Sequence, residues 1–229
     1  MRINKYISET GFCSRRQTDR MISEGRITIN DVICEPGAEV TEGDLVLIDG
    51  EPIPKRADPV YILLHKPVGI TCTAAKHVEG NIIDFVNYPS RIFAVGRLDK
   101  ASEGLILLTN DGAIVNKMMR SEHGHEKEYV VTVDKPITDD FLYKMSSGIE
   151  ILGVTTKRCV TTYQSEYVFR IILTEGLNLQ IRRMCKELGY RVLRLERIRI
   201  MNMLIEGIDK GTWRDLTPEE LEILFEQLN

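Results

Sequence analysis

The sequence predicts an α+β protein, in which a small α/β domain precedes a larger domain with a mixed, mainly antiparallel sheet flanked by helices. Three observations lead to this prediction. Short β-branched and apolar runs typical of strands, such as Tyr129–Val133, recur along the chain. Capped helix patterns stand between and after these runs. The proline-rich segment 52–59 separates the first domain from the rest. Strands of this kind with helices outside them favour an α+β architecture.

The first domain, residues 1–52, is expected to contain two helices followed by strands. Residues 4–10 form the first helix, which Gly11 closes. Ser14 begins the second helix, because Gln17 three residues later completes a capping box, and this helix ends before Gly25. Strands follow at 26–29 and 45–48, and Asp49-Gly50 is a hairpin turn signal. The prolines of segment 53–59 disfavour both helix and sheet, so we interpret it as a linker.

The second domain, residues 60–229, alternates between strand and helix patterns. The expected strands are 60–64, 92–95, 104–109, 129–133, several between 150 and 174, and 190–200. The expected helices are 113–120, 138–145, 178–188 and a last one after Thr217. Thr217, Pro218 and Glu220 supply the cap, the N1 proline and the N3 acid of that last helix.

Composition is that of a globular protein without a membrane span. The 229 residues are 43% hydrophobic and 28% charged, no apolar run is long enough to cross a bilayer, and the N-terminus lacks the pattern of a signal peptide. We therefore expect a cytoplasmic protein with no membrane partner. The 5 cysteines are odd in number and scattered, which indicates reduced thiols rather than a disulfide framework. His123 and His125 lack a third ligand nearby, so no metal is expected.

Charge is strongly segregated along the chain, although the net charge is only -4. Residues 1–30 carry 6 Lys/Arg against 3 Asp/Glu, and residues 178–202 carry 7 against 2. Residues 31–51 carry 7 acids and no Lys or Arg, and residues 203–229 carry 7 acids against 2 basic residues. Local basic patches steer a polyanion better than net charge predicts. On charge alone, nucleic-acid binding by the N-terminal helices and a merely solvated helix face are equally open, since Arg15 and Asp19 can pair along one helix.

Asp99 is the first candidate for chemistry. It lies in the stretch Gly96–Leu105, between two apolar runs that read as buried strands. A carboxylate in such a place is costly unless it is paired or used. An ion pair with an arginine such as Arg97, a turn cap or a metal ligand would also explain it, and on the residues alone a structural role is favoured. Glu103 is the nearest partner for a two-carboxylate glycosidase, but its surroundings suggest a loop.

The first domain resembles the S4 domain, a module that binds structured RNA. The resemblance rests on the runs 3–7, 11–16, 22–30 and 43–47, which follow in order with the expected spacing over residues 2 to about 50. The stretch Gly96–Leu105 reads GRLDKASEGL and resembles the catalytic motif of RNA pseudouridine synthases. Residues 64–69, 127–131 and 176–184 resemble three further blocks of that family. The chain is most similar to the branch that joins an S4 domain to a ribosomal RNA pseudouridine synthase domain, of the large-subunit synthase F type.

The resemblance assigns roles to residues around Asp99. It implies that Asp99 acts as nucleophile or base on a uridine flipped out of RNA, without a cofactor. It implies that Arg182 pairs with Asp99 and keeps it ionised, and that Tyr129 packs on the flipped uracil. Without the resemblance, Arg182 would be a phosphate contact and Tyr129 an aromatic residue of the core.

Three further residues are assigned to substrate binding by the same resemblance. Ile198 is placed against the other face of the base, with Ile200 as the alternative. Arg97 and Leu98 precede Asp99 directly in the motif.

Basic residues of both domains are expected to contact RNA. They are Lys5, Ser14, Arg15, Arg16, Arg20 and Arg26 in the first domain, with Ser14 offering a capped helix start, and Arg183 and Arg197 in the second. Strict alternation puts Leu195, Arg197 and Arg199 on one face of the last strand, and Arg194, Glu196 and Ile198 on the other. Because neither face is purely basic, ion pairs with acids such as Glu196 remain equally open.

The leading hypothesis is a cofactor-free isomerase that acts as a monomer on large-subunit ribosomal RNA or a pre-ribosomal particle. Two alternatives remain: the same chemistry on tRNA, and a non-catalytic RNA-binding factor of ribosome assembly. The intact Asp99, Tyr129 and Arg182 blocks argue against the second alternative, since a pure binder has no use for a carboxylate facing phosphates.

Overall fold

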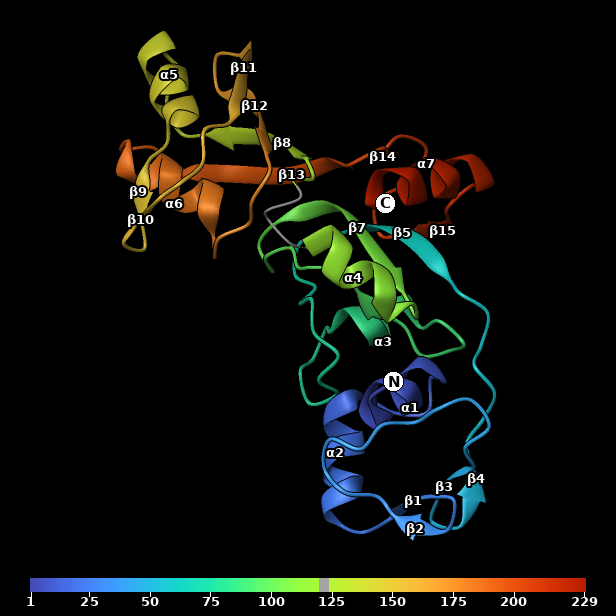
Figure 1. Ribbon diagram of the computed structural model, residues 1–229. Helices are drawn as coiled ribbons and strands as arrows, with labels where there is room; N and C mark the ends of the chain where they lie inside the picture. The colour runs from blue at the N-terminus through green and yellow to red at the C-terminus, as the bar shows by residue number, and fades with distance from the viewer. Residues whose placement is uncertain (120–123) are drawn as a thin grey trace.

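The computed structural model describes residues 1–119 and 124–229. The molecule is elongated, with the N-terminal domain at one end and a long sheet running through the larger part (Figure 1). The α+β prediction is confirmed: a mixed sheet with helices follows a small domain that has its own sheet. No helix in the described part of the chain is long and apolar enough to span a membrane.

The N-terminal domain packs two helices against a four-stranded antiparallel sheet. Its elements are α1 (Ile3–Glu9), α2 (Arg15–Ser23), β1 (Ile27–Ile29), β2 (Val32–Ile33), β3 (Val46–Ile48) and β4 (Glu51–Pro52). The strand order is β2-β1-β3-β4. Ile3 and Ile7 of α1 and Ile22 of α2 are buried against Ile27 and Val46 of the sheet.

The capping box at the start of α2 is present. The Ser14 side chain accepts from the backbone N–H of Gln17, and the Gln17 side chain accepts from the backbone N–H of Ser14 at 2.9 Å. Gly25 follows the helix with φ +68°, a left-handed conformation that suits a glycine after a helix end. The two ends of α2 are therefore encoded locally.

The linker is held against the larger part at its far end. The Asn110 side chain accepts from the backbone N–H of Val60 at 2.8 Å and donates to the carbonyl oxygen of Asp58 at 2.8 Å. Arg56 lies within 3.5 Å of Glu9 and 3.7 Å of Asp111, so one linker cation links α1 to the second domain. These contacts connect α1 and the segment 53–59 to the larger part of the molecule.

The larger part contains the remaining elements. Its strands are β5 (Tyr61–Lys66), β6 (Phe93–Ala94), β7 (Glu103–Thr109), β8 (Lys127–Val133), β9 (Glu150–Ile151), β10 (Val154–Thr155), β11 (Val160–Ser165), β12 (Val168–Leu173), β13 (Val192–Ile200), β14 (Met203–Leu204) and β15 (Trp213–Asp215). Its helices are α3 (Ile82–Val86), α4 (Gly112–Met119), α5 (Asp139–Ser147), α6 (Gln180–Glu187) and α7 (Pro218–Leu228).

The nine-stranded sheet consists of two antiparallel halves. Its order is β11-β12-β8-β13-β7-β5-β15, with β14 beside β13 and β6 beside β7. Among the described strands of this sheet, β13 and β7 are the pair that runs parallel, and they are paired at two positions, Glu196 with Glu103 and Arg197 with Gly104. The two halves of the sheet are therefore joined by a short parallel ladder.

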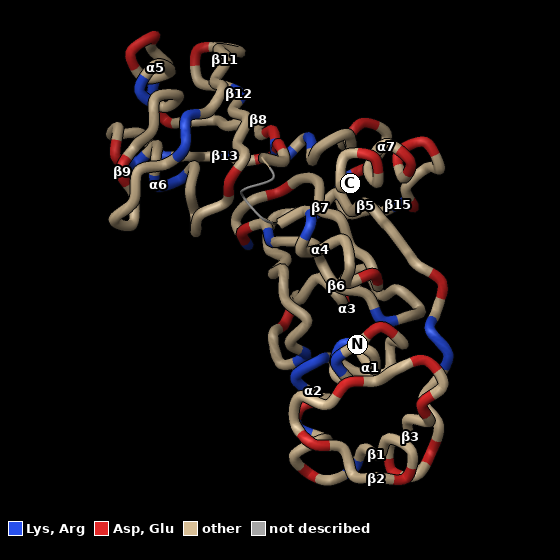
Figure 2. The backbone as a smooth tube through the Cα atoms, in the orientation of Figure 1, with Lys and Arg blue, Asp and Glu red and all other residues tan. Residues whose placement is uncertain are grey.

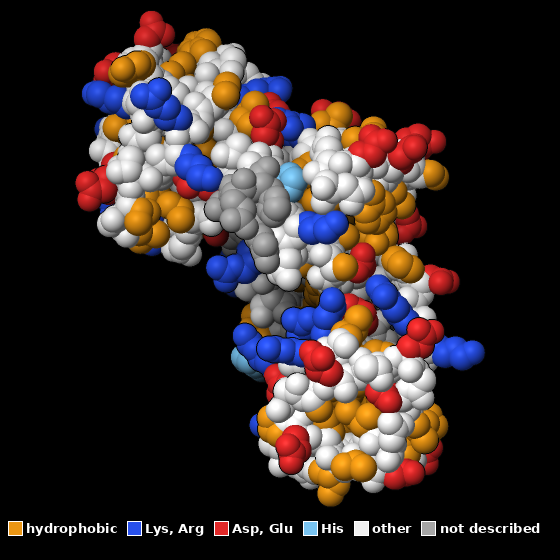
Figure 3. All heavy atoms as spheres, viewed as in Figure 1, with side chains coloured by type: hydrophobic (Ala, Val, Ile, Leu, Met, Phe, Trp, Pro, Cys, Tyr) orange, Lys and Arg blue, Asp and Glu red, His pale blue; other side chains and the backbone are white. Residues whose placement is uncertain are grey.

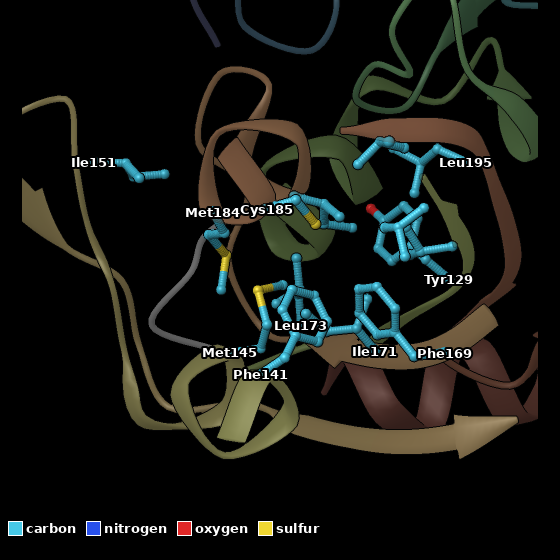
Figure 4. Close-up of a cluster of buried hydrophobic side chains, with 14 of the residues drawn as sticks. Tyr129, Phe141, Met145, Ile151, Phe169, Ile171, Leu173, Met184, Cys185 and Leu195 are labelled. Carbon is cyan, nitrogen blue, oxygen red and sulfur yellow. The ribbon is translucent and has the colours of Figure 1, made fainter. Parts of the chain in front are cut away.

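The two half-sheets are covered differently, which explains their sequence patterns. In the half containing β5 and β7, α4 and α7 cover one face and α3 covers the other. Both strands are therefore apolar at nearly every position. In the other half, α5 and α6 cover one face, where Tyr129, Phe141, Phe169 and Met184 belong to one buried cluster (Figure 4). Strand β8 accordingly alternates between buried and half-buried residues.

Most of the predicted elements are present, with shifted ends. The helix predicted at 113–120 is α4, although Arg120 lies outside the described residues. The capping box at Thr217 and Glu220 is present at the start of α7. The strands β2, β4, β14 and β15 and the short helix α3 were not predicted, because each is too short to show a period.

Candidate active site

A glycine determines how closely the two half-sheets meet. Gly104 has φ +112°, and a Cβ atom built on it would overlap the backbone nitrogen and carbonyl of Arg197. Any other residue would both strain the backbone and push β7 away from β13. The spacing Asp99-x₄-Gly104 therefore places the carboxylate beside the junction of the half-sheets.

The loop that carries Asp99 is fastened to the loop that follows β5. The backbone N–H of Ser102 donates to the Asp99 carbonyl at 3.0 Å, and the N–H of Gly69 donates to the Lys100 carbonyl at 2.8 Å. The N–H of Leu98 donates to the Cys72 sulfur at 3.4 Å. Asp99 itself is only half-buried. Its backbone is thus fixed on both sides while its side chain reaches solvent.

A fully buried lysine lies beneath this loop. The Lys66 ammonium donates to the carbonyl oxygens of Pro67 at 2.9 Å and Ile70 at 3.0 Å. Burial lowers the pKa of Lys66, and the negative charge of Asp99 opposes that shift. The sequence contained this lysine in the Lys66-Pro67 block, yet it was not among the predicted site residues. Lys66 supplies positive charge close to Asp99.

Arg182 holds the Asp99 loop but does not pair with the carboxylate. Its Nη2 donates to the carbonyl oxygen of Ala101 at 2.9 Å and to the Ser102 hydroxyl at 3.2 Å, and its Nη1 donates to the Val192 carbonyl at 3.4 Å. Within residues 1–119 and 124–229, Asp99 forms no ion pair. The direct Arg182–Asp99 pair is therefore absent from this structure, and Arg182 acts on the backbone that follows Asp99.

Asp99 and Tyr129 line one cavity of about 290 Å³ at the junction of the half-sheets. Tyr129 comes from β8, is 8% exposed, and lies at the end of the buried cluster next to Leu195 (Figure 4). The charged residues of the cavity wall are Arg97, Asp99, Lys127, Glu175 and Arg197, and His125 also lines it. Such a mixture of apolar walls and a few polar groups is typical of a ligand site.

Two bulges in β13 decide which of its side chains reach the cavity. The register with β8 shifts between Val192 and Arg194 and again between Arg197 and Arg199. Ile198 is the extra residue of the second bulge, so Ile200 joins Leu195 and Arg197 on the cavity wall. The structure therefore places the alternative Ile200, and not Ile198, on the cavity wall.

The structure places Arg197, one of the expected RNA contacts, in the interior of the protein. Arg197 is 3% exposed, and it donates to the carbonyl oxygens of Leu105 at 2.7 Å and Arg97 at 3.4 Å. Its side chain links β13 to β7 and to the Asp99 loop in the interior. It can therefore contact RNA only through a group that enters the cavity. Arg97 is exposed at the cavity, while Leu98 is buried in its wall.

Acids pair with the arginines that remain on the other face of β13. Arg194 binds Glu103 and, at 2.9 Å, Glu196. Glu103 is 4% exposed and also lies 2.6 Å from Lys210, so it is a structural anion rather than a second catalytic carboxylate. RNA contact and ion pairing with nearby acids were both open for the arginines of this strand. At Arg194 the structure shows ion pairing.

Exposed arginines gather on α2. Arg15, Arg16 and Arg20 are exposed and form no ion pair with another described residue. The pair expected between Arg15 and Asp19 is absent, because Asp19 accepts from the Asn4 side chain at 2.9 Å. Figure 2 shows Lys and Arg residues on α2, and Figure 3 shows Lys and Arg side chains gathered where the N-terminal domain meets the larger part of the molecule.

The other predicted RNA contacts are already engaged within the protein. Arg26 lies 2.6 Å from Asp49 and 3.2 Å from Glu24, and Lys5 lies 3.7 Å from Glu9. The Ser14 hydroxyl is used in its capping box, and the guanidinium of Arg183 donates to Asn178 at 3.0 and 3.1 Å. These groups must give up their present partners to bind phosphate. The exposed arginines of α2, which form no ion pair with another described residue, can bind phosphate without such an exchange.

The histidine pair can be followed only in part. His123 lies outside the described residues, and the His125 Nε2 lies 3.1 Å from the Lys117 carbonyl oxygen. The described residues contain no group of three or more His, Cys, Asp or Glu side chains that could hold a metal ion.

The chain is similar to known proteins over nearly its whole length. The S4 domain matches residues 1–46, and the RNA pseudouridylate synthase family matches residues 60–187. The dual-specificity RNA pseudouridine synthase RluF of Salmonella typhi is 54% identical over 226 residues, which cover 98% of this chain and 78% of the relative. The ribosomal large subunit pseudouridine synthase B of Bacillus subtilis is 33% identical over 232 residues, which cover 97% and 95%. A crystal structure of a pseudouridylate synthase matches with a TM-score of 0.73 and 29% identity, over 98% of this chain and 99% of that one.

Proposed function

The chain belongs to the family of RNA pseudouridylate synthases, with an S4 domain at its N-terminus, and we propose that it converts a specific uridine of large-subunit ribosomal RNA to pseudouridine at Asp99. The observation that carries this proposal is the presence of Asp99 and Tyr129 on one cavity at the junction of the half-sheets. We assign residues 1–52 to RNA binding, 53–59 to the linker and 60–229 to catalysis.

The cavity suits one base taken out of an RNA stack. Flipping a base costs a few kcal/mol, which stacking on an aromatic side chain helps to recover. Tyr129 presents such a ring, and Ile200 and Leu195 extend the apolar wall beside it. We propose that Tyr129 stacks on the uracil and that Ile200 rather than Ile198 contacts the base.

Asp99 supplies the chemistry as a carboxylate. It can attack C1′ of the ribose, or it can remove a ribose proton, and either route breaks the bond between C1′ and N1 of the uracil. The uracil then turns and bonds to C1′ through C5. Lys66 places positive charge close to Asp99. Neither route requires a cofactor.

Arg182 is proposed as a positioning residue for this loop. It binds the backbone and hydroxyl two and three residues after Asp99, so it determines where the carboxylate points. Misplacement of a reacting group by about 1 Å can cost roughly 100-fold in rate. The exposed Arg97 lies at the same cavity and is suited to a phosphate next to the flipped nucleotide.

The substrate assignment rests on the relatives and on the basic surface. One relative is named for the ribosomal large subunit, and another is named as a dual-specificity RNA enzyme. The second name indicates more than one RNA substrate for that relative, and we propose tRNA as the further substrate of this chain. The arginines of α2 provide the electrostatic surface that a folded RNA requires.

The test is to map pseudouridine in ribosomal RNA and tRNA from cells with and without the gene, and then to supply each RNA to the purified protein. We expect at least one RNA position to lack pseudouridine in cells without the gene. The purified protein should restore pseudouridine at that position in vitro. Absence of any such position in both RNAs would contradict the proposal and favour a non-catalytic RNA-binding factor.

A further inference from the structure

Lys127 faces the same cavity as Asp99, although neither motif nor pattern assigned it a role. It lies two residues before Tyr129 on β8, so both side chains point to the same face of the sheet. Lys127 is opposite Leu173 on β12 and Ile200 on β13, and all three line the cavity. The lysine is half-buried there.

The acids next to Lys127 in the sequence do not neutralise it. Glu126 and Glu128 point to the opposite face, where Arg199 lies 2.8 Å from Glu126 and 3.0 Å from Glu128. Arg170 lies 3.4 Å from Glu128 as well. Within residues 1–119 and 124–229, Lys127 itself forms no ion pair or side-chain hydrogen bond.

Neither carboxylate of the cavity wall, Asp99 or Glu175, forms an ion pair with Lys127 in the part of the chain that the structure describes. Glu175 accepts from the Lys157 backbone at 2.9 Å and from Gln180 at 2.8 Å, so it is engaged with its own loop. Burial and the nearby Arg197 lower the pKa of Lys127, which reflects the cost of holding this charge without a partner. An anion that forms inside the cavity would remove that cost.

The proposed reaction forms such an anion by either route. When the bond between C1′ and N1 breaks, its electron pair stays on the uracil and spreads over N1 and the two carbonyl oxygens. C1′ is compensated by a new bond to the Asp99 carboxylate, or by loss of a ribose proton to it. Later C5 bonds to C1′ as the Asp99–C1′ bond breaks or, on the second route, as Asp99 returns its proton to the ribose. C5 then releases its proton and N1 takes one up, so Asp99 is regenerated and the product is an isomer of the substrate.

We propose that the Lys127 ammonium donates a hydrogen bond to the detached uracil anion and stabilises it while the base turns. This inference rests on the proposed function and adds a catalytic residue to it. Lys127 lies beside Tyr129, whose ring is proposed to stack on the uracil, so its ammonium group is close to the base. The exposed Arg97 is the better candidate for a phosphate. Preorganised charge of this kind acts on the transition state more than on the bound substrate.

The test compares Lys127→Met, Lys127→Arg and wild type in single-turnover assays on the target RNA. Lys144→Met, at an exposed lysine of α5, is the matched control and should behave as wild type. We expect Lys127→Met to lower the maximal rate by about 10²–10³-fold. RNA affinity should stay within about twofold, since the charge acts after binding. Lys127→Arg should recover part of the rate.

A second substrate separates a catalytic role from a structural one. RNA with 5-fluorouridine at the target has a less basic leaving group, so breaking its C1′–N1 bond should depend less on Lys127. We expect the rate defect of Lys127→Met, followed by consumption of the fluorinated nucleoside, to be at least about tenfold smaller on this RNA.

Three results would overturn the inference. They are a rate for Lys127→Met within about threefold of wild type, a defect that is confined to RNA affinity, and an equal defect on both substrates. The affinity result would instead identify Lys127 as a phosphate contact. If the wild-type protein formed no pseudouridine at all, the proposed function itself would fail. If wild type is active and Asp99→Ala is inactive, the proposed function stands, and the Lys127 variants then test this inference alone.

Discussion

Gly104 lies against the backbone of Arg197 so closely that no side chain fits between β7 and β13. This contact joins the two half-sheets at one of their two parallel pairs. Along the chain, the Asp99 loop precedes Gly104, and the apolar residues of β7 follow it. The geometry of the cavity therefore depends on a residue that does not itself line the cavity.

We expect Gly104→Ala to lower the free energy of unfolding by about 2–3 kcal/mol, because the added Cβ combines backbone strain with overlap. Chemical denaturation monitored by circular dichroism measures this loss. Gly112→Ala is the control, since no atom lies within 4 Å of its Cβ position and it begins α4. That variant should be neutral or slightly more stable. Equal stability of the two variants would show that the junction tolerates separation.

Asp99→Asn should abolish product formation, with a loss of at least about 10³-fold in single-turnover rate. The amide is nearly isosteric but neither attacks carbon nor accepts a proton at neutral pH. RNA affinity, measured by filter binding, should be largely retained because Asp99 forms no ion pair among the described residues. A fully active Asp99→Asn enzyme would remove Asp99 from the mechanism.

Arg182→Lys should slow the reaction by about 10–100-fold, because a single ammonium cannot bind both Ala101 and Ser102 in the way that the guanidinium does. If Arg182 acts through this loop, Ser102→Ala should slow wild type but add little to Arg182→Lys. A double-mutant cycle on the single-turnover rate measures that coupling. Strictly additive effects would argue against the positioning role.

Replacing Arg15, Arg16 and Arg20 together by Gln should weaken RNA binding and flatten its dependence on salt. The slope of log affinity against log salt concentration should fall by about 2–3, since each phosphate contact contributes roughly 0.7–0.9. Arg26→Gln is the control, because Asp49 and Glu24 already neutralise that guanidinium. A triple variant with an unchanged slope would move the RNA surface away from α2.

Glu103→Gln tests the ion pairs behind the junction. Burial alone would raise the pKa of Glu103, but hydrogen bonds and charge from Lys210 and Arg194 outweigh it and hold the pKa below its usual range. A carboxyl with a depressed pKa stabilises the fold above its unfolded pKa and loses this contribution as pH falls through the folded value.

We therefore expect Glu103→Gln to cost about 1–2 kcal/mol at pH 7, a modest value because Lys210 and Arg194 are half exposed. The difference from wild type should shrink below about pH 4, as the wild-type carboxyl becomes protonated. Glu187→Gln, at an exposed residue of α6, should show no such pH dependence. Denaturation midpoints between pH 3 and 7 provide the comparison.

Local signals in the sequence predicted much of the fold. The capping boxes at Ser14 and Thr217 each involve residues three apart, and both are present. The runs Ile62–Leu64 of β5 and Leu105–Leu108 of β7 are apolar because helices cover both faces of these strands. The short elements β2, β4, α3, β14 and β15 were missed, since their pairing partners are not readable from so few residues.

The sequence by itself determined the family, the candidate carboxylate and the aromatic partner, because these are carried by motifs whose residues are close neighbours along the chain. Only the tertiary structure decided that Ile200 replaces Ile198 at the cavity, that Arg197 is buried, and that Arg182 binds the loop rather than Asp99. It also brought Lys127 to the same cavity as Asp99. The physical reason is that bulges, sheet junctions and side-chain reach depend on contacts between residues distant in sequence, which strict alternation along one strand cannot predict.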